Sequence, residues 1–592
     1  MPDDLDPLAD ARWHPEPELI AFGDEATARA ALERLGEATW RTALDYLYRE
    51  GVRRGVAPVT YPELRKRYFA PSGGLPSPAP ERPTPSAEIL AEFRERLAPY
   101  LLNAYHPGTL SYFTPAPLPI SIAGEVLAQW ANQGIDVWSC GPAGAFVEEE
   151  VIRWLCDLVG YADGRSAEAV GARTAGVPPA GAPGTGHGAE GNGGPESFGV
   201  LASGGTMANI MGLMIARDVH LPRRTDAAGA GLPPTAALDP DAMAAAGLSP
   251  YPPPPRGAAL DGWRVYTSDQ AHFSIAKAID FLGFPGETLA VVPSNERFRL
   301  RGAIVEERIR ADLATGLRPL AISAVAGTTN TGSVDATAEL ADVAARHGLW
   351  LHVDAAYGGA ALLSKRDAPR VPDLARADSI TIDPHKWLFQ AYDIGGLLVR
   401  RRADLEQTFH RAPEYYRTAR HEEQPLNWYE LALEGTRRWR ALKLWMSWKH
   451  LGTEGFGRLV EANDDLAAHL ATRIAAADDL EAIPAGPPEL SVVCFRHLPG
   501  GRARAAAIEA ADPDALDHYT DCLATMLQHS GEGWLSTTVL RGRTCLRAGI
   551  VNILSSPSAV DEILAALRRL SPAAAREVGL PALDADYASG SR

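Results

Sequence analysis

Short apolar runs alternate with amphipathic segments along the middle of the chain. The runs predict buried strands at residues 263–267, 289–292, 319–326, 349–353 and 379–382. Helical periodicity separates several of them, at residues 272–283, 303–316 and 335–348. Asp335 is expected to cap the last of these helices and Gly348 to end it. Such alternation implies a mainly parallel sheet with helices on both faces.

The carboxyl ends of parallel strands are expected to carry the functional side chains, because binding sites in open α/β sheets lie beyond those ends. This rule places four segments on one rim of the sheet. They are the residues after Thr267, residues 326–329, Asp354, and the loop after residue 382.

The rest of the chain divides around this region. Helical periodicity at residues 27–51 precedes a proline-rich connector, and from about residue 440 helices and strands mix as in a smaller α+β domain. We therefore expect a helical N-terminal extension at 1–118, a large domain at 119–442 and a small domain at 443–592. Residues 163–197 and 221–258 are rich in Gly, Ala and Pro, and are expected to form mobile surface insertions; a partner-binding loop is the alternative.

Charge and composition narrow the class of protein. The chain has 57 Lys and Arg against 74 Asp and Glu, a net charge of −17, which argues against a protein that binds nucleic acid. No run of eighteen apolar residues predicts a membrane span, and the acidic, proline-broken N-terminus resembles neither a secretory signal nor a transit peptide. The 5 cysteines lack metal-ligand spacing. We therefore expect a cytoplasmic globular protein with no metal site.

A lysine stands in the loop that follows the last predicted strand. Pro384 keeps the segment 383–387, Asp-Pro-His-Lys-Trp, out of helix and central strand, so Lys386 is presented from a tight turn. In apolar surroundings its pKa is expected to be depressed, which would make the amine a nucleophile. The alternative is an ordinary solvated surface lysine.

Three further features lie on the same predicted rim. Asp354 ends a strand, where it would pair with a ring nitrogen or cap the next turn, and His272 would stack on a flat ligand or simply fill the rim. Gly204 and Gly205 precede a helix, whose free N–H groups would hold a phosphate; a simple turn is the alternative. Together with Lys386, these groups match what pyridoxal phosphate needs.

The motifs that carry this chemistry resemble a known family. SDQAHFS, HVDAAYGG and DPHKW occur in the order found in the group II pyridoxal-phosphate-dependent amino-acid decarboxylases, which act on aromatic amino acids, glutamate, cysteine sulfinate or 2,4-diaminobutyrate. The resemblance runs from about His106 to Asp561, interrupted by the two insertions. It implies an α/β fold of the pyridoxal-phosphate fold type I, with a small C-terminal α+β domain.

The resemblance also implies a role for each matching residue. Lys386 forms the Schiff base, Asp354 pairs with the pyridine nitrogen, and Ala356 lies against the ring. His272 stacks over the ring and contacts the region of the substrate carboxylate. The remaining cofactor contacts are Gly205 and Thr206 at the phosphate, Thr329 near the ring, and His385 near the phosphate.

Two segments bear on the reaction and the substrate. Tyr415 matches a tyrosine on the family's mobile loop that returns a proton after CO2 leaves, although Tyr416 beside it leaves the register open and both tyrosines could merely anchor the loop. Phe113 and Thr114 match the substrate-binding region. An aromatic pair of Tyr112 and Phe113 there favours an aromatic or other apolar side chain, although a core would look the same.

The resulting expectation is an enzyme, a carboxy-lyase that converts an L-amino acid to its amine and CO2 as a homodimer with the active site at the interface. Aldehyde synthesis or another carbon–carbon lyase reaction on the same scaffold is the first alternative. A non-catalytic scaffold is the second, and the intact set of Lys386, Asp354 and His272 argues against it. No GxGxxG motif with a following acid supports a dinucleotide enzyme.

Overall fold

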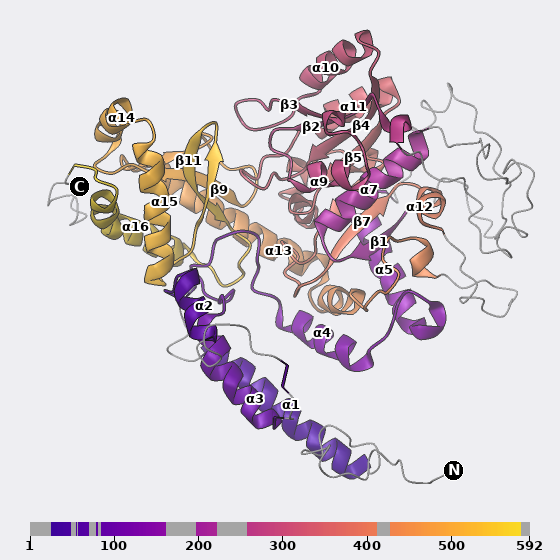
Figure 1. Ribbon diagram of the computed structural model, residues 1–592, viewed down its shortest axis with the longest axis horizontal. Coiled ribbons are helices and arrows are strands. Elements are labelled where there is room, and N and C mark those ends of the chain that lie inside the picture. The colour runs from indigo at the N-terminus through magenta and orange to yellow at the C-terminus, as the bar shows by residue number, and fades with distance from the viewer. Residues whose placement is uncertain are drawn as a thin grey trace, which may run out of the picture.

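The computed structural model describes residues 25–48, 55, 57–69, 79–80, 84–161, 197–221, 257–410 and 427–581 (Figure 1). Most of the two predicted insertions lies outside these ranges. Within the described ranges, no helix is long and apolar enough to cross a membrane.

A seven-stranded sheet forms the centre of the larger part of the molecule, in the order β1-β7-β6-β5-β4-β2-β3. Strands β2 to β6 run parallel, while β7 is antiparallel to both β6 and β1. The five predicted strands are confirmed. The strands are β1 (Phe198–Ala202), β2 (Trp263–Ser268), β3 (Leu289–Val292), β4 (Arg318–Val325), β5 (Trp350–Asp354), β6 (Ser379–Ile382) and β7 (Gly395–Val399).

Helices cover both faces of this sheet, as predicted. Every residue of β5 and β6 is buried although their side chains alternate between the faces, so neither face is open to water. The covering helices are α5 (Pro142–Leu158), α7 (Gly205–His220), α9 (Ser274–Phe281), α10 (Gly302–Ala314), α11 (Thr337–His347) and α12 (Arg402–Phe409).

The predicted cap of α11 is wrong at one end and right at the other. Asp335 makes no cap; its buried carboxylate accepts the backbone N–H groups of Leu300 and Val325, both at 2.7 Å, because β4 and the loop after β3 meet there. Burial raises the pKa of this carboxyl to about 7. Gly348 ends the helix in the left-handed conformation, with φ of 65°.

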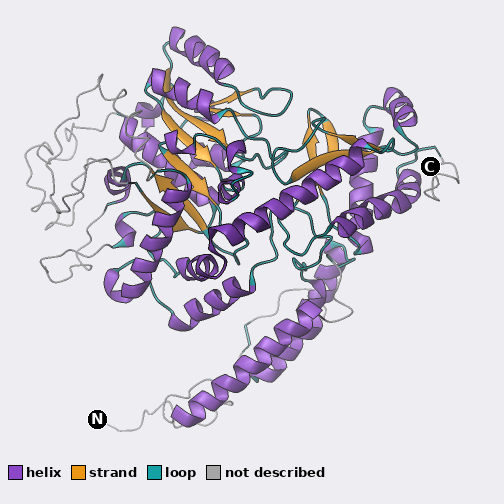
Figure 2. Ribbon diagram, turned by 180° about the vertical axis from the view of Figure 1, so that it is seen from behind, coloured by secondary structure: helices purple, strands orange, loops and turns teal. Residues whose placement is uncertain are grey.

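A second, antiparallel sheet of four strands lies beside the first, in the order β10-β11-β9-β8. Helix α13 runs from the large sheet to this smaller one, as Figure 2 shows. The predicted domain boundary at 442–443 falls inside α13. The elements are β8 (Leu480–Ala482), β9 (Val492–His497), β10 (Ser536–Leu540), β11 (Arg543–Gly549), α13 (Ala441–Ala475), α14 (Arg502–Ala511), α15 (Ala515–Ser530) and α16 (Pro557–Glu577).

The N-terminal helices extend away from the two sheets as an arm (Figure 1). Its first and third helices contact each other, and Arg94, in the helical turn that follows the third, donates to the hydroxyl of Thr42 at 3.1 Å. The next helix, α4 (Pro119–Ala131), packs against α13. The arm consists of α1 (Glu25–Tyr48), α2 (Tyr61–Phe69) and α3 (Ser86–Glu92).

Candidate active site

A cavity of about 420 Å³ opens at the carboxyl ends of the parallel strands, the rim that the sequence predicts. It is lined by the residues that follow β1, β2, β4, β5 and β6. Eight of the eleven predicted site residues line it: Gly205, Thr206, His272, Thr329, Asp354, Ala356, His385 and Lys386.

Lys386 lies in the turn after β6 and points its amine at a carboxylate. Its Nζ is 3.0 Å from Oδ2 of Asp383, a buried residue three positions earlier. Burial lowers the pKa of the amine, but the negative charges of Asp383 and Asp354 outweigh it, so the pKa of Lys386 is raised. The expectation of a depressed pKa is therefore wrong for the protein alone, because the turn supplies a counter-charge.

Asp354 is the last residue of β5, and its carboxylate is held by neutral donors. Oδ2 accepts from the side-chain amide of Asn209 at 2.8 Å, and Oδ1 accepts from the backbone N–H of Ala356 at 3.1 Å. The second contact is the turn cap that the sequence also allowed. Among the described residues Asp354 has no ion-pair partner. A buried carboxylate in this state fits a cationic nitrogen in the cavity.

His272 follows β2 and reaches the cavity beside Asp354. Burial lowers the pKa of its imidazole despite the nearby Asp354, so the ring is neutral at neutral pH. Its Nδ1 lies 2.8 Å from the hydroxyl of Ser274. The exposed ring of Phe273 packs against it, with ring centroids 4.1 Å apart.

The glycines after β1 open α7 as predicted and leave the first amide N–H groups of the helix free of intrahelical bonds. A Cβ on Gly205 would lie 2.8 Å from Oδ2 of Asp383, so a side chain would fill this end of the cavity. A buried ion pair holds the end of β1 in place. Glu148 accepts the N–H of Leu201 and pairs with Arg437, which donates to the carbonyl of Leu201 at 2.7 Å.

Two predicted substrate residues lie beside the cavity and are not part of its lining. Phe113 stacks on Tyr357, a lining residue, with ring centroids 4.1 Å apart, and Nζ of Lys386 lies 6.0 Å from the Phe113 ring. The hydroxyl of Thr114 lies 3.2 Å from the phenol oxygen of Tyr392. The remaining predicted residue, Tyr415, lies outside the described residues.

Three residues at the site are absent from the sequence prediction. Asp383 stands within the DPHKW motif, where its spacing of three from Lys386 was the available signal. Asn209 follows the phosphate turn but has no marker of its own. Arg547 is a charged residue within the mostly buried strand β11. Its guanidinium is buried over the Phe113 ring, 4.6 Å from the centroid, and one of its nitrogens has no partner among the described residues.

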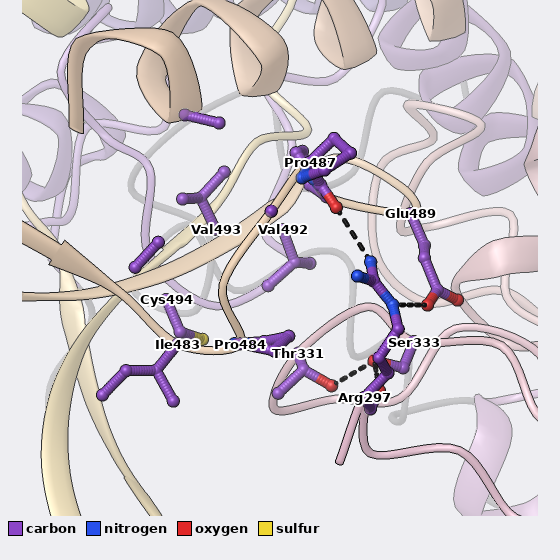
Figure 3. A pocket seen from close by; sticks show the side chains of 14 residues that line it. Arg297, Thr331, Ser333, Ile483, Pro484, Pro487, Glu489, Val492, Val493 and Cys494 are labelled. Atoms are coloured by element: carbon purple, nitrogen blue, oxygen red, sulfur yellow. Dashed lines mark hydrogen bonds and ion pairs between the residues drawn. The ribbon is translucent and has the colours of Figure 1, made fainter. Parts of the chain in front are cut away.

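The small sheet holds the loop after β4 that carries Thr329. The backbone carbonyl of Asn330 accepts from Cys494 at 3.0 Å and from Arg547 at 3.2 Å. A second, small cavity lies where the loops of the large sheet contact those of the small sheet. In Figure 3, the guanidinium of Arg297 lies between the carboxylate of Glu489 and the carbonyl of Pro487, so the two sheets are joined by charged contacts next to the site.

The residues present fit pyridoxal phosphate. The cavity has the volume of a cofactor site, an amine at its base and, at one wall, the carboxylate of Asp354, which has no ion-pair partner within the described ranges. At the other end, a turn without side chains leaves helix N–H groups for a phosphate. The neutral ring of His272 lies on the same rim.

Comparison with known proteins agrees with this fit. A family model described as "Pyridoxal-dependent decarboxylase conserved domain" matches residues 257–498. The L-2,4-diaminobutyrate decarboxylase of Rhizobium meliloti is 31% identical over 83% of this chain and 83% of its own length. The aromatic-L-amino-acid decarboxylase of Bacillus atrophaeus is 29% identical over 83% of this chain and 87% of its own.

Solved structures share the fold. The crystal structure of Oryza sativa TDC with PLP and tryptamine has a TM-score of 0.73 at 24% identity, covering 92% of this chain and 98% of that one. The decarboxylase domain from Vibrio parahaemolyticus has a TM-score of 0.69 at 24% identity, covering 92% and 96%. The predicted fold is confirmed. The chain belongs to the pyridoxal-dependent decarboxylases, and it is a carboxy-lyase that uses pyridoxal phosphate to decarboxylate an amino acid.

Proposed function

We propose that this enzyme decarboxylates an L-amino acid with an aromatic or other apolar side chain to the amine. The choice of an aromatic or apolar substrate rests on the aromatic side chains that line and surround the cavity. Phe273 and Tyr357 line it, Phe113 stacks on Tyr357, and the ring of Tyr392 lies 4.8 Å from that of His385. Aromatic walls favour a planar apolar group through burial and ring stacking. The Bacillus atrophaeus relative carries the matching name.

The cofactor would be held by the residues that the resemblance implies and the cavity brings together. Gly205 and Thr206 would bind the phosphate with His385 nearby, Asp354 the ring nitrogen, and Lys386 the aldehyde carbon. His272 and Ala356 would lie on the two faces of the ring, with Thr329 near it. When bound, pyridoxal phosphate supplies an aldehyde that takes up an amine and a ring that takes up the electrons left by CO2.

Protons are moved by this chain's own residues. Lys386 must lose one before its amine can attack, and the ion pair with Oδ2 of Asp383, at 3.0 Å, favours the protonated amine until the pH or a bound group changes that balance. Two N–H groups donate to the carboxylate of Asp354 and orient it, and a carboxylate facing the ring nitrogen would favour a proton there. Tyr415 returns a proton to the substrate's α carbon, a role that rests on the resemblance.

Arg547 is the group we assign to the substrate's α-carboxylate region. Its guanidinium is buried, has no ion-pair partner within the described ranges, and lies over Phe113 beside the cavity. A buried cation without a counter-ion is costly, and a bound carboxylate would relieve that cost.

The test is a spectrum followed by product analysis. Purified protein with pyridoxal phosphate should show the visible band of the lysine-bound cofactor and release CO2, and Lys386→Ala should lose both. A panel of the twenty L-amino acids should give the highest kcat/KM for aromatic ones. A wild-type protein that shows no band refutes the cofactor assignment, and preference for an acidic or diamino substrate refutes the aromatic one.

Aldehyde synthesis is the second candidate, because a 4-hydroxyphenylacetaldehyde synthase of Rhodiola rosea shares the fold, with a TM-score of 0.69 at 21% identity. The tyrosine at position 415 favours the amine product. Ammonia and peroxide should stay at background while amine and CO2 form in equal amounts.

We also propose a cytoplasmic homodimer with the active site at its interface.

A further inference from the structure

Behind Asp354 lies a buried amide that uses all of its hydrogen-bonding capacity. Oδ1 of Asn209 accepts from the hydroxyl of Thr381 at 2.6 Å and from Nε2 of His352 at 3.0 Å. Its Nδ2 donates to Oδ2 of Asp354 and to the hydroxyl oxygen of Ser274, both at 2.8 Å. Since an amide oxygen only accepts and an amide nitrogen only donates, the orientation of Asn209 is fixed by its four partners.

The direction of the hydrogen bonds can be followed from the far end of this network. The indole N–H of Trp350 only donates, and it reaches the hydroxyl oxygen of Ser379 at 2.9 Å. That hydroxyl lies 2.8 Å from Nδ1 of His352, to which it donates. Burial lowers the pKa of His352 to about 4, so the ring is neutral and its single proton lies on Nε2, toward Asn209. Every donor in this branch therefore points toward Asp354.

A second branch leads from Asn209 to His272. The hydroxyl oxygen of Ser274 accepts from Asn209, which leaves its own proton for Nδ1 of His272 at 2.8 Å. The backbone N–H of Ser274 faces the same nitrogen at 3.3 Å. Nδ1 is therefore an acceptor, and the proton of the neutral ring is on Nε2, which has no hydrogen-bond partner among the described residues.

We infer that Asn209 is a positioning residue that holds the carboxylate of Asp354 and, through Ser274, sets the tautomer of His272. The inference rests on the proposed function, because it supposes that Asp354 and His272 contact the cofactor ring. One amide then orients both the anion at the ring nitrogen and the imidazole of His272 on the same rim. Removal of Asn209 takes away the donor to Oδ2 of Asp354 and disconnects His272 from it.

The test measures cofactor binding separately from catalysis. The probe is 4-deoxypyridoxine 5′-phosphate, which has the ring nitrogen and phosphate but no aldehyde, so it does not react with Lys386. Asn209→Leu should weaken its binding at least tenfold by calorimetry, or about 1.4 kcal/mol. Binding of inorganic phosphate should stay within twofold. The matched control is Thr408→Val, which removes a buried hydroxyl that has no partner in the described part of the chain.

A milder variant guards against misfolding. Thr381→Val removes one hydroxyl that donates to Asn209, and it should weaken probe binding about threefold. If the circular dichroism spectrum shows that Asn209→Leu is unfolded, Thr381→Val still decides the test. Equal probe affinity in Thr381→Val and Thr408→Val, with Asn209→Leu unchanged or unfolded, overturns the inference. A wild-type protein that does not bind the probe refutes the proposed function instead.

The tautomer of His272 gives an independent readout in the cofactor-free protein. With ¹⁵N-labelled histidine, and the signal assigned by its loss in His272→Gln, the wild type should show a proton on Nε2 only. Ser274→Ala removes the hydroxyl but keeps the backbone N–H, so a detectable fraction of rings protonated on Nδ1 should appear. A proton on Nδ1 in the wild type contradicts the inferred direction of the hydrogen bonds.

Discussion

At the scale of single residues, the ion pair of Lys386 and Asp383 sets when the amine becomes reactive. Its charge interaction raises the pKa of Lys386 above the ordinary value. A lysine with a raised pKa stabilises the fold below its ordinary pKa, and this contribution is lost as the pH rises through the higher folded-state value. At neutral pH the pair is therefore intact and the amine is protonated.

Asp383→Asn is expected to make Lys386 react faster near neutral pH. Burial lowers the pKa of Lys386, and without that carboxylate less negative charge opposes the lowering. The pKa therefore falls, and more of the amine is neutral. The rate at which added pyridoxal phosphate develops its visible band should therefore have a lower pH midpoint than in the wild type. The exposed carboxylate of Asp373 supplies the control, since Asp373→Asn should leave the midpoint unchanged. An unaltered midpoint in Asp383→Asn would contradict the pairing.

Arg547→Met should separate substrate binding from cofactor binding. We expect KM for the preferred amino acid to rise about tenfold or more, because a charged hydrogen bond to the carboxylate is lost. The visible band with pyridoxal phosphate alone should persist. Arg541→Met, at an exposed position, serves as the control. An unchanged KM in the Arg547 variant would remove this residue from the substrate site.

The sequence alone predicts the residues whose motifs are contiguous. Lys386, Asp354 and His272 each stand in a recognisable segment after a strand, and the cavity brings all three together. Asn209 and Arg547 are not predicted, because their surroundings come from elements far apart in the chain. Asn209 lies 145 residues from Asp354 along the chain, and no local pattern records that contact.

At the scale of elements, close helix packing supports the loop that carries Lys386. Gly124 of α4 faces the backbone of α13, where an added Cβ would lie 2.7 Å from Cα of Lys443. Nζ of Lys443 donates to the backbone carbonyl of Asp393, near the end of the same loop, at 3.0 Å. A change in the spacing of α4 and α13 would therefore move Lys443 and alter the loop that it contacts.

Gly124→Ala should lower the free energy of unfolding by about 1–3 kcal/mol, because the two backbones must move apart. Urea denaturation followed by circular dichroism measures it. Gly36→Ala is the matched control, another helical glycine but with open space around it, and it should be neutral or slightly stabilising. Equal midpoints for the two variants would show that α4 and α13 tolerate the extra methyl group.

Arg437→Met should be among the most destabilising single substitutions. It leaves the carboxylate of Glu148 buried without its cation at the end of β1, at a cost of about 3–5 kcal/mol. The same urea measurement applies. For comparison, Arg29→Met breaks an exposed pair with Glu33 and should leave the urea midpoint nearly unchanged, because solvent screens that pair. A small effect at Arg437 would mean that water reaches Glu148.

The elements themselves follow the sequence where periodicity is strong. The predicted parallel strands are all present, since runs of buried apolar residues are a local property. The prediction of Asp335 as a helix cap is wrong, because its partners come from β4 and from the loop after β3, which only the folded sheet brings near. Strands β1 and β7 pair antiparallel although they lie far apart along the chain, and no local signal predicts such a pairing.

At the scale of the whole molecule, α4 presents a face that the single chain leaves open. Val126, Leu127 and Trp130 are 42%, 52% and 62% exposed on this one helix. Clustered apolar side chains of this kind mark association surfaces. We expect a second copy of the chain to cover them.

Sedimentation equilibrium should therefore give twice the chain mass of 63.3 kDa. Trp130→Glu should shift the mass toward that of one chain, because it places a charge in an apolar contact. Val291→Glu, at a half-exposed position on the sheet, should keep the wild-type mass. A wild-type mass of one chain would refute the dimer, and a Trp130→Glu dimer would place the interface elsewhere.

Helix α7 has the cavity at its first residue, and its last residue, His220, packs against Trp350 at the start of β5. Its 16 residues span about 24 Å at the usual rise, so the two ends are well separated. A fluorescent label or surface tether attached at the exposed position 220 would sit far from the reacting atoms. The enzyme thus offers a point of attachment for immobilised synthesis of amines.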